Sequence, residues 1–256
     1  MSSVSAETVL SATNLTKSFR GFTAVNDVSL HVRKGTIHAL IGPNGAGKTT
    51  TFNLLTKFLQ PTSGRIEFMG RDITKEQPAG IARRGLVRSF QISAVFPHMT
   101  VLENVRIAVQ KRNGDWLNFL ASKRRNSQYD EEAFRLLGTV GLDKYAGHLA
   151  TDLSYGRKRT LELATTLALE PQLLLLDEPM AGMAHEDIDR VAEIIRAIGR
   201  TRTILMVEHN LSVVSSLCTH VTVLARGSVL AEGDYKTVAA DPRVIEAYIG
   251  TSPAHV

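Results

Sequence analysis

Gly42-Pro43-Asn44-Gly45-Ala46-Gly47-Lys48-Thr49, followed by Thr50, decides the fold, because it places glycines, a lysine and a hydroxyl group at fixed offsets. Glycines at this spacing let the backbone curl so that successive N–H groups point at phosphate oxygens. Lys48 brings a positive charge to the terminal phosphates, and the Thr49 hydroxyl can bind Mg²⁺. The stretch therefore predicts a site for a nucleoside triphosphate.

The segments on either side of this loop favour the same interpretation. Residues 36–41, Thr-Ile-His-Ala-Leu-Ile, have the composition of a buried strand, and residues 50–58 carry apolar side chains at helical spacing. A helix that starts at the loop would direct its positive end at the same anion. A flexible glycine loop without a ligand is the alternative, and the strand–loop–helix order disfavours it.

Length and composition fit one large α/β domain or a core with an inserted subdomain. The 256 residues can bury a sizeable core, and the formal net charge of +5 fits anionic surroundings without identifying one. Cys218 is the single cysteine, which excludes an internal disulfide bond. No apolar run approaches the roughly 18 residues that span a bilayer, and the first residues lack the features of a signal peptide. We therefore expect a cytoplasmic protein.

The N-terminal part of the chain is rich in predicted strands. Residues 9–15 and 65–69 have strand composition, and residues 27–33 alternate apolar and polar side chains as a half-solvated antiparallel strand does. Phe19 and Phe22 flank a glycine turn between the first two strands. Periodicity alone favours a place in the core for either Phe19 or Phe22.

In residues 92–165 the strand patterns give way to helical patterns, and this segment is expected to form a helical insertion. Within it, residues 101–110 and 131–140 have the pattern of amphipathic helices. Basic clusters surround the aromatic segment near Trp116, a combination that suits phospholipid headgroups or nucleic acid. A solvated helical surface over a small buried cluster is the alternative that we favour.

A pair of carboxylates marks a second chemical centre. Residues 171–176 form an apolar run, typical of a parallel strand buried on both faces, and it ends in Asp177 and Glu178. The carboxyl ends of such strands are where open α/β sheets bind ligands. Asp177 would hold Mg²⁺ and Glu178 would polarise the attacking water. The alternative is a helix cap ahead of Pro179.

Two further segments suggest contacts with an anion. Residues 203–208 form another apolar strand, and the imidazole of His209, which follows it, could contact a γ-phosphate. Leu-Ser-Tyr-Gly at residues 153–156 is typical of a helix start, with Ser154 as the N-cap and Gly156 allowing close approach of an anion. Why one chain would need two anion sites at helix starts is open at this point.

In their order along the chain, these motifs resemble those of the ATP-binding subunits of ABC transporters. They are the phosphate loop, Gln91 after a strand, Leu-Ser-Tyr-Gly, Leu-Leu-Leu-Leu-Asp-Glu-Pro and Glu-His, and the resemblance runs from about residue 9 to residue 250. It implies a single ABC ATP-binding domain: a RecA-like α/β P-loop core and an antiparallel β subdomain from residues 1–91 and 166–256, and a helical subdomain from residues 92–165 that carries the signature motif.

The resemblance also implies a role for each motif. Phe19 would stack on adenine, which replaces the expectation that it lies in the core, and Gln91 would sense the γ-phosphate and Mg²⁺. Residues 153–156 would face ATP held by the opposite subunit, so that two subunits enclose two ATP molecules. The implied ATP-binding residues are Phe19, Gly42, Pro43, Asn44, Gly45, Ala46, Gly47, Lys48, Thr49, Thr50, Gln91, Ser154, Tyr155 and Gly156; the catalytic residues are Glu178, His209, Lys48 and Gln91; the Mg²⁺ ligands are Thr49, Gln91 and Asp177.

Shorter segments are similar to the larger ATP-binding subunit of branched-chain or hydrophobic amino acid importers. They cover residues 85–91, 99–105, 178–183 and 242–250. Importers of urea and short-chain amides are near relatives. The similarity implies a homodimer or heterodimer of ATP-binding subunits on the inner face of the membrane, permease subunits, and a periplasmic or extracellular solute-binding protein. No nucleic acid partner is expected.

The permease would dock between the core and the helical insertion, near residues 91–100, where Ile92, Val95, Phe96 and Met99 supply apolar contacts.

Two positions depart from the family pattern. Arg157 replaces a glutamine after the signature glycine, and Ala184 replaces an aspartate in the loop after the acidic pair. The second change weakens any assumption about communication across the dimer and suggests a partner that differs from this chain.

Two other functional classes are alternatives. A soluble ABC-type ATPase that acts on nucleic acid usually has two ATP modules or a long coiled coil. A small-molecule kinase would leave the second helix start unexplained.

Overall fold

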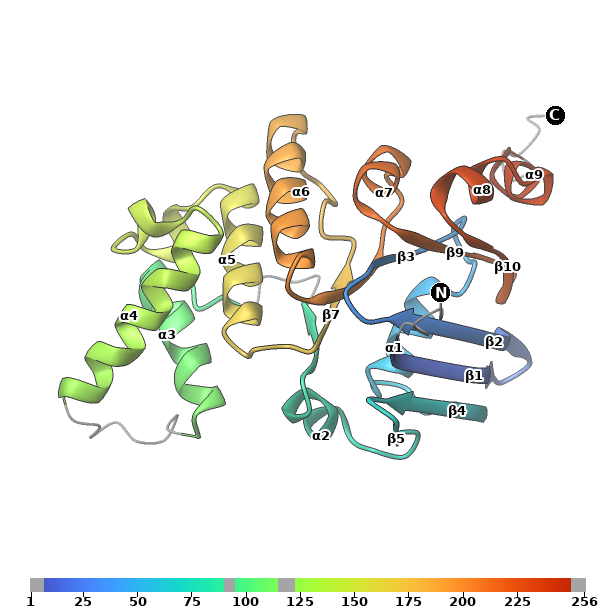
Figure 1. Cartoon of the computed structure of the whole chain (residues 1–256), viewed down its shortest axis with the longest axis horizontal. Helices are drawn as coiled ribbons and strands as arrows, with labels where there is room; N and C mark the ends of the chain where they lie inside the picture. The colour runs from blue at the N-terminus through green and yellow to red at the C-terminus, as the bar shows by residue number, and fades with distance from the viewer. Residues whose placement is uncertain (1–6, 90–94, 115–122, 250–256) are drawn as a thin grey trace, which may run out of the picture.

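The computed structural model describes the backbone of residues 7–89, 95–114 and 123–249. Within these residues the strands form two sheets (Figure 1). The antiparallel sheet has the order β2 (Phe22–Arg33), β1 (Thr8–Phe19), β4 (Ser63–Phe68) and β5 (Arg71–Asp72). The mainly parallel sheet has the order β10 (Ser228–Gly233), β9 (His220–Ala225), β3 (Ile37–Ile41), β8 (Thr203–Val207), β7 (Leu173–Asp177) and β6 (Leu86–Ser89), with β10 antiparallel to β9.

The central strands β3, β7 and β8 are buried along their whole length. Because successive side chains of a strand point to opposite faces, each strand contributes to two hydrophobic cores. Leu174, Leu176 and Met206 belong to the core on one face, whereas Leu175 and Leu205 belong to the core on the other. The continuous apolar runs predicted from the sequence are therefore explained by burial on both faces.

One core joins the two sheets through α1 (Lys48–Leu55). Phe52 and Leu54 of this helix pack with Val28 and Leu30 of β2 and with Leu40 of β3. Strand β2 alternates buried and exposed residues and pairs antiparallel with β1, so the prediction of a half-solvated antiparallel strand is confirmed.

The helices α3 (Val101–Arg112) and α4 (Lys123–Thr139) lie at the end of the molecule opposite the antiparallel sheet (Figure 1). They include both segments predicted as amphipathic helices. Thr100 and Glu103 form a capping box that fixes the start of α3, with the Thr100 N–H 2.8 Å from the Glu103 carboxylate. Short 3₁₀ turns, η1 (Asp143–Tyr145) and η2 (Ala150–Asp152), lead into α5 (Tyr155–Leu167), which runs through the predicted boundary at residues 165 and 166.

The remaining helices cover the edges and faces of the parallel sheet. They are α2 (Pro78–Arg83), α6 (His185–Gly199), α7 (Leu211–Leu217), α8 (Tyr235–Ala239) and α9 (Pro242–Ile249). The last two lie beside β9 and β10 (Figure 1). None of the helices in the described part of the chain combines the length and apolar composition that crossing a bilayer requires. This α/β core with an antiparallel sheet and inserted helices confirms the predicted fold class.

Phe19 and Phe22, either of which periodicity alone placed in the core, are both on the surface. Phe19 is 45% exposed and Phe22 is 64% exposed. They are cross-strand neighbours at the end of the β1–β2 hairpin, where the chain turns through Gly21 at φ 77°. That prediction was wrong because the hairpin extends past the helix that covers the rest of its inner face. Trp116 lies outside the described residues.

Candidate nucleotide site

The predicted phosphate loop connects β3 to α1, as the sequence indicated. Gly42 has φ 150°, and a Cβ atom at this position would lie 2.1 Å from the Leu224 carbonyl oxygen. Only glycine therefore fits, and the loop backbone packs directly on β9. Asn44, Gly45 and Thr49 are exposed, so the outer part of the loop and the start of α1 are open to a ligand.

Lys48 lies within the curl of this loop. Its Nζ donates hydrogen bonds to the carbonyl oxygens of Gly42 at 2.6 Å and Pro43 at 2.9 Å. Burial lowers the pKa of Lys48, and the nearby charge of Glu178 acts in the opposite direction. The ammonium group is thus placed between the loop and the acidic pair.

Strand register brings the acidic pair to the same sheet edge as the loop. Val207 of β8 pairs with Leu40 on one side and with Asp177 on the other. Because neighbouring strands lie about 4.8 Å apart, the ends of β3 and β7 are roughly 10 Å apart across β8. A group the size of a nucleotide phosphate chain can bridge that distance.

Asp177 forms an ion pair that the sequence analysis missed. Arg88 of β6 donates from Nη2 to the Asp177 carboxylate at 2.5 Å and from Nη1 to Asn53 Oδ1 of α1 at 2.7 Å. The side chains of Arg88 and Asp177 are only 12% and 4% exposed. The signal that could have indicated this pair is the charge of Arg88 within a strand that lies beside the acid-bearing strand.

The backbone at Glu178 turns sharply out of the sheet. Its φ is 47°, an uncommon value for a residue other than glycine, and its N–H donates to the Val207 carbonyl oxygen at 3.0 Å. The strand end of β8 therefore fixes where the Glu178 side chain leaves the backbone, and that side chain is half-buried.

Glu208 is a second functional candidate that the sequence analysis passed over. Its carboxylate is fully buried and accepts from the N–H groups of Met180 at 3.1 Å, His209 at 2.9 Å and Asn210 at 3.1 Å. It thereby ties the loop after β7 to the loop after β8. The side chain of His209 is 64% exposed, so a ligand at this edge can reach it, and its Nδ1 lies 4.0 Å from the Glu208 carboxylate.

The predicted helix start at Leu-Ser-Tyr-Gly is confirmed. Ser154 is the N-cap of α5, and its Oγ accepts from the Arg157 N–H at 3.4 Å. A Cβ atom on Gly156 would lie 2.4 Å from the Asp187 carboxyl group of α6, so the first turns of α5 and α6 are in close contact. The exposed Tyr155 donates its hydroxyl to the Ala181 carbonyl oxygen at 3.2 Å.

Arg157, one of the departures from the expected pattern, stacks on an aromatic ring. Its guanidinium carbon lies 4.4 Å from the ring centroid of Tyr145 in η1. The contact is favourable as a cation–π interaction. Tyr145 therefore holds the extra charge beside the start of α5.

The predicted residues thus separate into two groups within one chain. The phosphate loop, Lys48, the acidic pair and His209 meet at one edge of the parallel sheet. Of the residues at the start of α5, Tyr155 contacts the loop after β7 and Gly156 contacts α6. Phe19 stands at the end of β1. Gln91 lies outside the described residues, so its role stays a prediction.

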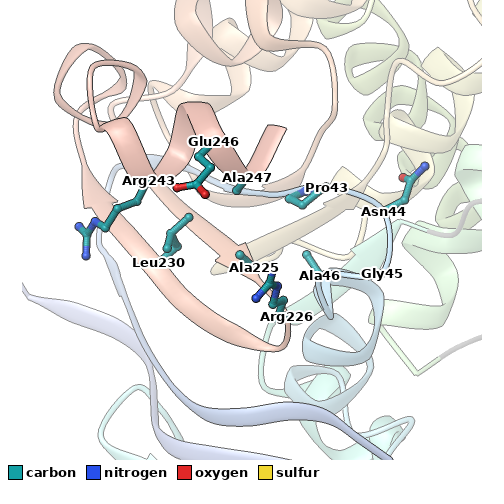
Figure 2. A pocket seen from close by; sticks show the side chains of 10 residues that line it. All are labelled: Pro43, Asn44, Gly45, Ala46, Ala225, Arg226, Leu230, Arg243, Glu246 and Ala247. Atoms are coloured by element: carbon teal, nitrogen blue, oxygen red, sulfur yellow. The ribbon is translucent and has the colours of Figure 1, made fainter. Parts of the chain in front are cut away.

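A pocket of about 520 Å³ adjoins the outer side of the phosphate loop (Figure 2). Strands β9 and β10 and helix α9 form its other walls. Next to it, burial raises the pKa of Tyr248 in α9 to about 12, against the opposing effect of a backbone hydrogen bond from Gly42. The pocket is lined by Pro43, Asn44, Gly45, Ala46, Ala225, Arg226, Leu230, Arg243, Glu246 and Ala247.

Comparison with known families agrees with this geometry. Residues 25–181 match the family described as ABC transporter. Residues 228–254, which include β10, α8 and α9, match the family described as branched-chain amino acid ATP-binding cassette transporter.

Individual relatives match along nearly the whole chain. The chain is 38% identical over 251 residues to the high-affinity branched-chain amino acid transport ATP-binding protein BraF of Pseudomonas aeruginosa, covering 94% of this chain and 98% of BraF. It is 36% identical to the probable branched-chain amino acid transport ATP-binding protein LivG of Archaeoglobus fulgidus, covering 97% and 98%. The ADP conformation of MJ1267, an ATP-binding cassette of an ABC transporter, superposes with a TM-score of 0.82 at 32% identity, covering 95% and 99%.

Proposed function

The chain belongs to the ABC transporter family of ATP-binding proteins and is an ATPase, and from this we propose that it energises the import of branched-chain amino acids. It would act as one of two ATP-binding subunits on the cytoplasmic face of permease subunits, with a solute-binding protein on the outside. The observation that carries the ATPase part is the acidic pair at the same sheet edge as the phosphate loop. The proposal that branched-chain amino acids are the cargo rests on the names of relatives matched along nearly the whole chain.

ATP binding would begin with an exchange of partners at Lys48. Its ammonium group now contacts two carbonyl oxygens of its own loop, and phosphate oxygens would take their place. The described candidates for Mg²⁺, the Thr49 hydroxyl and the Asp177 carboxylate, offer the oxygen ligands that this ion prefers. When bound, Mg²⁺ would neutralise charge on the β- and γ-phosphates. Gln91 is proposed as a further ligand.

Hydrolysis would depend on Glu178. Its carboxylate would orient a water molecule and accept its proton while the water oxygen bonds to the γ-phosphorus and the bond to the bridging oxygen breaks, which yields ADP and phosphate. Loop N–H groups and Lys48 would stabilise the charge on the transferred group. His209 would contact the γ-phosphate. Ser154, Tyr155 and Gly156 would complete the site of the opposite subunit, and we propose that ATP closes the dimer and hydrolysis opens it.

Phe19 is proposed as the platform for the adenine ring, and this leads to a matched pair of variants. Stacking of a base on an aromatic ring contributes about 1–3 kcal/mol, so Phe19→Ala should weaken ATP binding by roughly 5- to 150-fold. Phe22→Ala removes the cross-strand neighbour, which is more exposed, and should leave affinity nearly unchanged. Calorimetric titration with an ATP analogue measures both. Equal affinities of Phe19→Ala and the unmodified protein would remove Phe19 from this role.

An apolar groove between the core and the inserted helices is proposed as the permease docking site. The groove has a volume of about 450 Å³ and lies between α2, β6 and α3. Phe58 and Phe96 at its rim are 51% and 52% exposed, an unusual amount of aromatic surface for a site facing water. Of the other apolar residues expected there, Val95 and Met99 are half-buried and do not line the groove, and Ile92 lies outside the described residues.

Transport in vesicles that contain the complete importer tests the proposed function. Phe96→Asp would place a charge in an apolar interface, so uptake of leucine should fall by roughly tenfold or more, although the variant still binds ATP. Phe134→Asp is the matched control, because Phe134 of α4 is 49% exposed and does not line the groove. Normal uptake with Phe96→Asp would contradict the docking site.

The cargo is tested in the same vesicles. Leucine, isoleucine and valine should be taken up in an ATP-dependent manner and should compete with one another, whereas urea and acetamide should not compete. Uptake of urea or acetamide without uptake of leucine would assign the chain to the related amide importers instead.

A further inference from the structure

Two histidines and a glutamate meet at the end of the parallel sheet that is opposite to the phosphate loop. His38 is near the start of β3, His220 is the first residue of β9, and Glu232 is near the end of the antiparallel β10. His38 and His220 are direct partners in the strand register. One ligand atom from each of the three side chains lies within 4.8 Å of the other two.

His38 is buried and only partly satisfied. Its Nε2 forms a hydrogen bond of 2.8 Å with the hydroxyl of Thr222, while its Nδ1 has no hydrogen-bond partner among the described residues. Buried polar atoms normally have a partner. In the tautomer whose Nε2–H donates to the Thr222 hydroxyl, Nδ1 carries a free lone pair, which is the form of imidazole that binds a metal.

The other two members are partly exposed and can move. His220 Nε2 and Glu232 Oε1 are 2.7 Å apart, and the rings of His38 and His220 meet edge to face with centroids 4.7 Å apart. A cavity of about 240 Å³ opens in front of the histidines. It is lined by His31, Arg33, Thr36, His38, Thr219 and His220.

We propose that His38, His220 and Glu232 bind a divalent transition metal, with Zn²⁺ as the ion that fits best. Two imidazoles and one carboxylate are an established set of zinc ligands. Ligand atoms around a tetrahedral zinc ion are roughly 3.3 Å apart. Separations that now reach up to 4.8 Å would therefore shorten, and His220 Nε2 and Glu232 Oε1, now 2.7 Å apart, would move slightly apart, which the exposed ends of these two side chains allow. Water or His31, which lines the cavity, would complete the coordination.

Two neighbouring groups adjust the strength of this site. The Thr222 hydroxyl fixes the orientation of the His38 ring from the second coordination sphere. Arg33 adds positive charge at the cavity, which opposes a cation, and the carboxylate of Glu232 offsets that charge. We therefore expect Zn²⁺ to bind more weakly here than at a comparable site without a nearby arginine.

The position of the site indicates its consequence. A metal bound there would join β3, β9 and β10 at the end of the sheet away from ATP hydrolysis. An ion that binds only the folded chain raises its stability. Because β3 leads into the phosphate loop, the metal would hold the strand on which that loop is built.

Titration of the full-length, nucleotide-free chain with ZnCl₂ after removal of metals by a chelator tests the proposal. One equivalent of Zn²⁺ should bind, and the melting temperature should rise. Co²⁺ should give the visible absorption of a tetrahedral complex. Mg²⁺ and Ca²⁺, which prefer oxygen ligands, should have neither effect. Absence of stoichiometric Zn²⁺ binding would overturn the proposal and leave His220 and Glu232 as a hydrogen-bonded pair.

Variants locate the bound ion. His220→Gln and Glu232→Gln affect partly exposed side chains, so they should fold, and each should weaken Zn²⁺ binding by more than tenfold. Thr222→Val should weaken it by roughly 10- to 100-fold through the orientation of His38. His148→Gln, which changes an exposed histidine elsewhere, is the control and should bind as the unmodified chain does. Undiminished binding by both His220→Gln and Glu232→Gln would also overturn the proposal.

Discussion

Replacing Glu178 by glutamine is expected to lower ATP turnover by about 10²- to 10⁴-fold while ATP binding is retained. The amide has nearly the shape of the carboxylate but cannot accept a proton from water. The Glu178 N–H is held by the Val207 carbonyl oxygen, so the new side chain should leave the backbone at the same place. The loss should therefore appear in the chemical step rather than in folding or affinity.

Phosphate release, nucleotide affinity and oligomeric state together check this expectation. Glu178→Gln should release phosphate slowly, bind ATP as the unmodified chain does, and accumulate a dimer in the presence of ATP. Glu186→Gln in the exposed first turn of α6 is the control and should retain turnover. Unchanged turnover in Glu178→Gln would remove this residue from the proposed role.

The dimer itself has a separate structural test. In a complex with a non-hydrolysable ATP analogue, Ser154 and Gly156 of one subunit should lie close to the γ-phosphate bound by the other. Within the single chain Gly156 contacts α6, and its neighbour Tyr155 contacts the loop after β7. If they stay far from every γ-phosphate under conditions that support turnover, the dimer mechanism proposed above fails.

The parts of the site that are local in sequence could be predicted from the sequence. The phosphate loop is a continuous segment whose glycines are required by its own backbone, as the positive φ angles of Gly45 (77°) and Gly47 (99°) illustrate. The acid-bearing strand is recognisable because burial on both faces removes polar residues from it. The N-cap at Ser154 is equally local, since it depends on residues one turn apart.

Features that depend on partners distant in sequence could not be predicted. Arg88 and Asp177 are 89 positions apart and meet only because β6 pairs with β7 in one register. Glu208 was read as a strand end, although its three N–H partners come from two different loops. The periodicity-based expectation of a core position for Phe19 was wrong for a related reason. Alternation along a strand does not reveal where the helix that covers the strand ends.

Replacing Arg88 by methionine should destabilise the protein strongly. The change leaves the Asp177 carboxylate buried without its cation and also removes the hydrogen bond to Asn53. Breaking a buried pair from one side costs about 3–5 kcal/mol, which for a chain of this size lowers the melting temperature by roughly 6–20 °C. Arg84→Met is the matched control, because Arg84 pairs with Glu76 nearer the surface and its loss should cost about 1 kcal/mol or less.

The double variant Arg88→Met with Asp177→Asn identifies the cause of that loss. If the unpaired charge is responsible, removing it as well should recover much of the stability, because an amide is far less costly to bury than a carboxylate. If lost packing around Arg88 is responsible, the double variant should be no more stable than Arg88→Met.

Binding of Mg²⁺ and ATP should also raise the melting temperature of Arg88→Met more than that of the unmodified chain, because Mg²⁺ held by Asp177 would supply the missing positive charge. An Arg88→Met protein that melts like the unmodified chain would show that burial of the Asp177 carboxylate does not depend on Arg88.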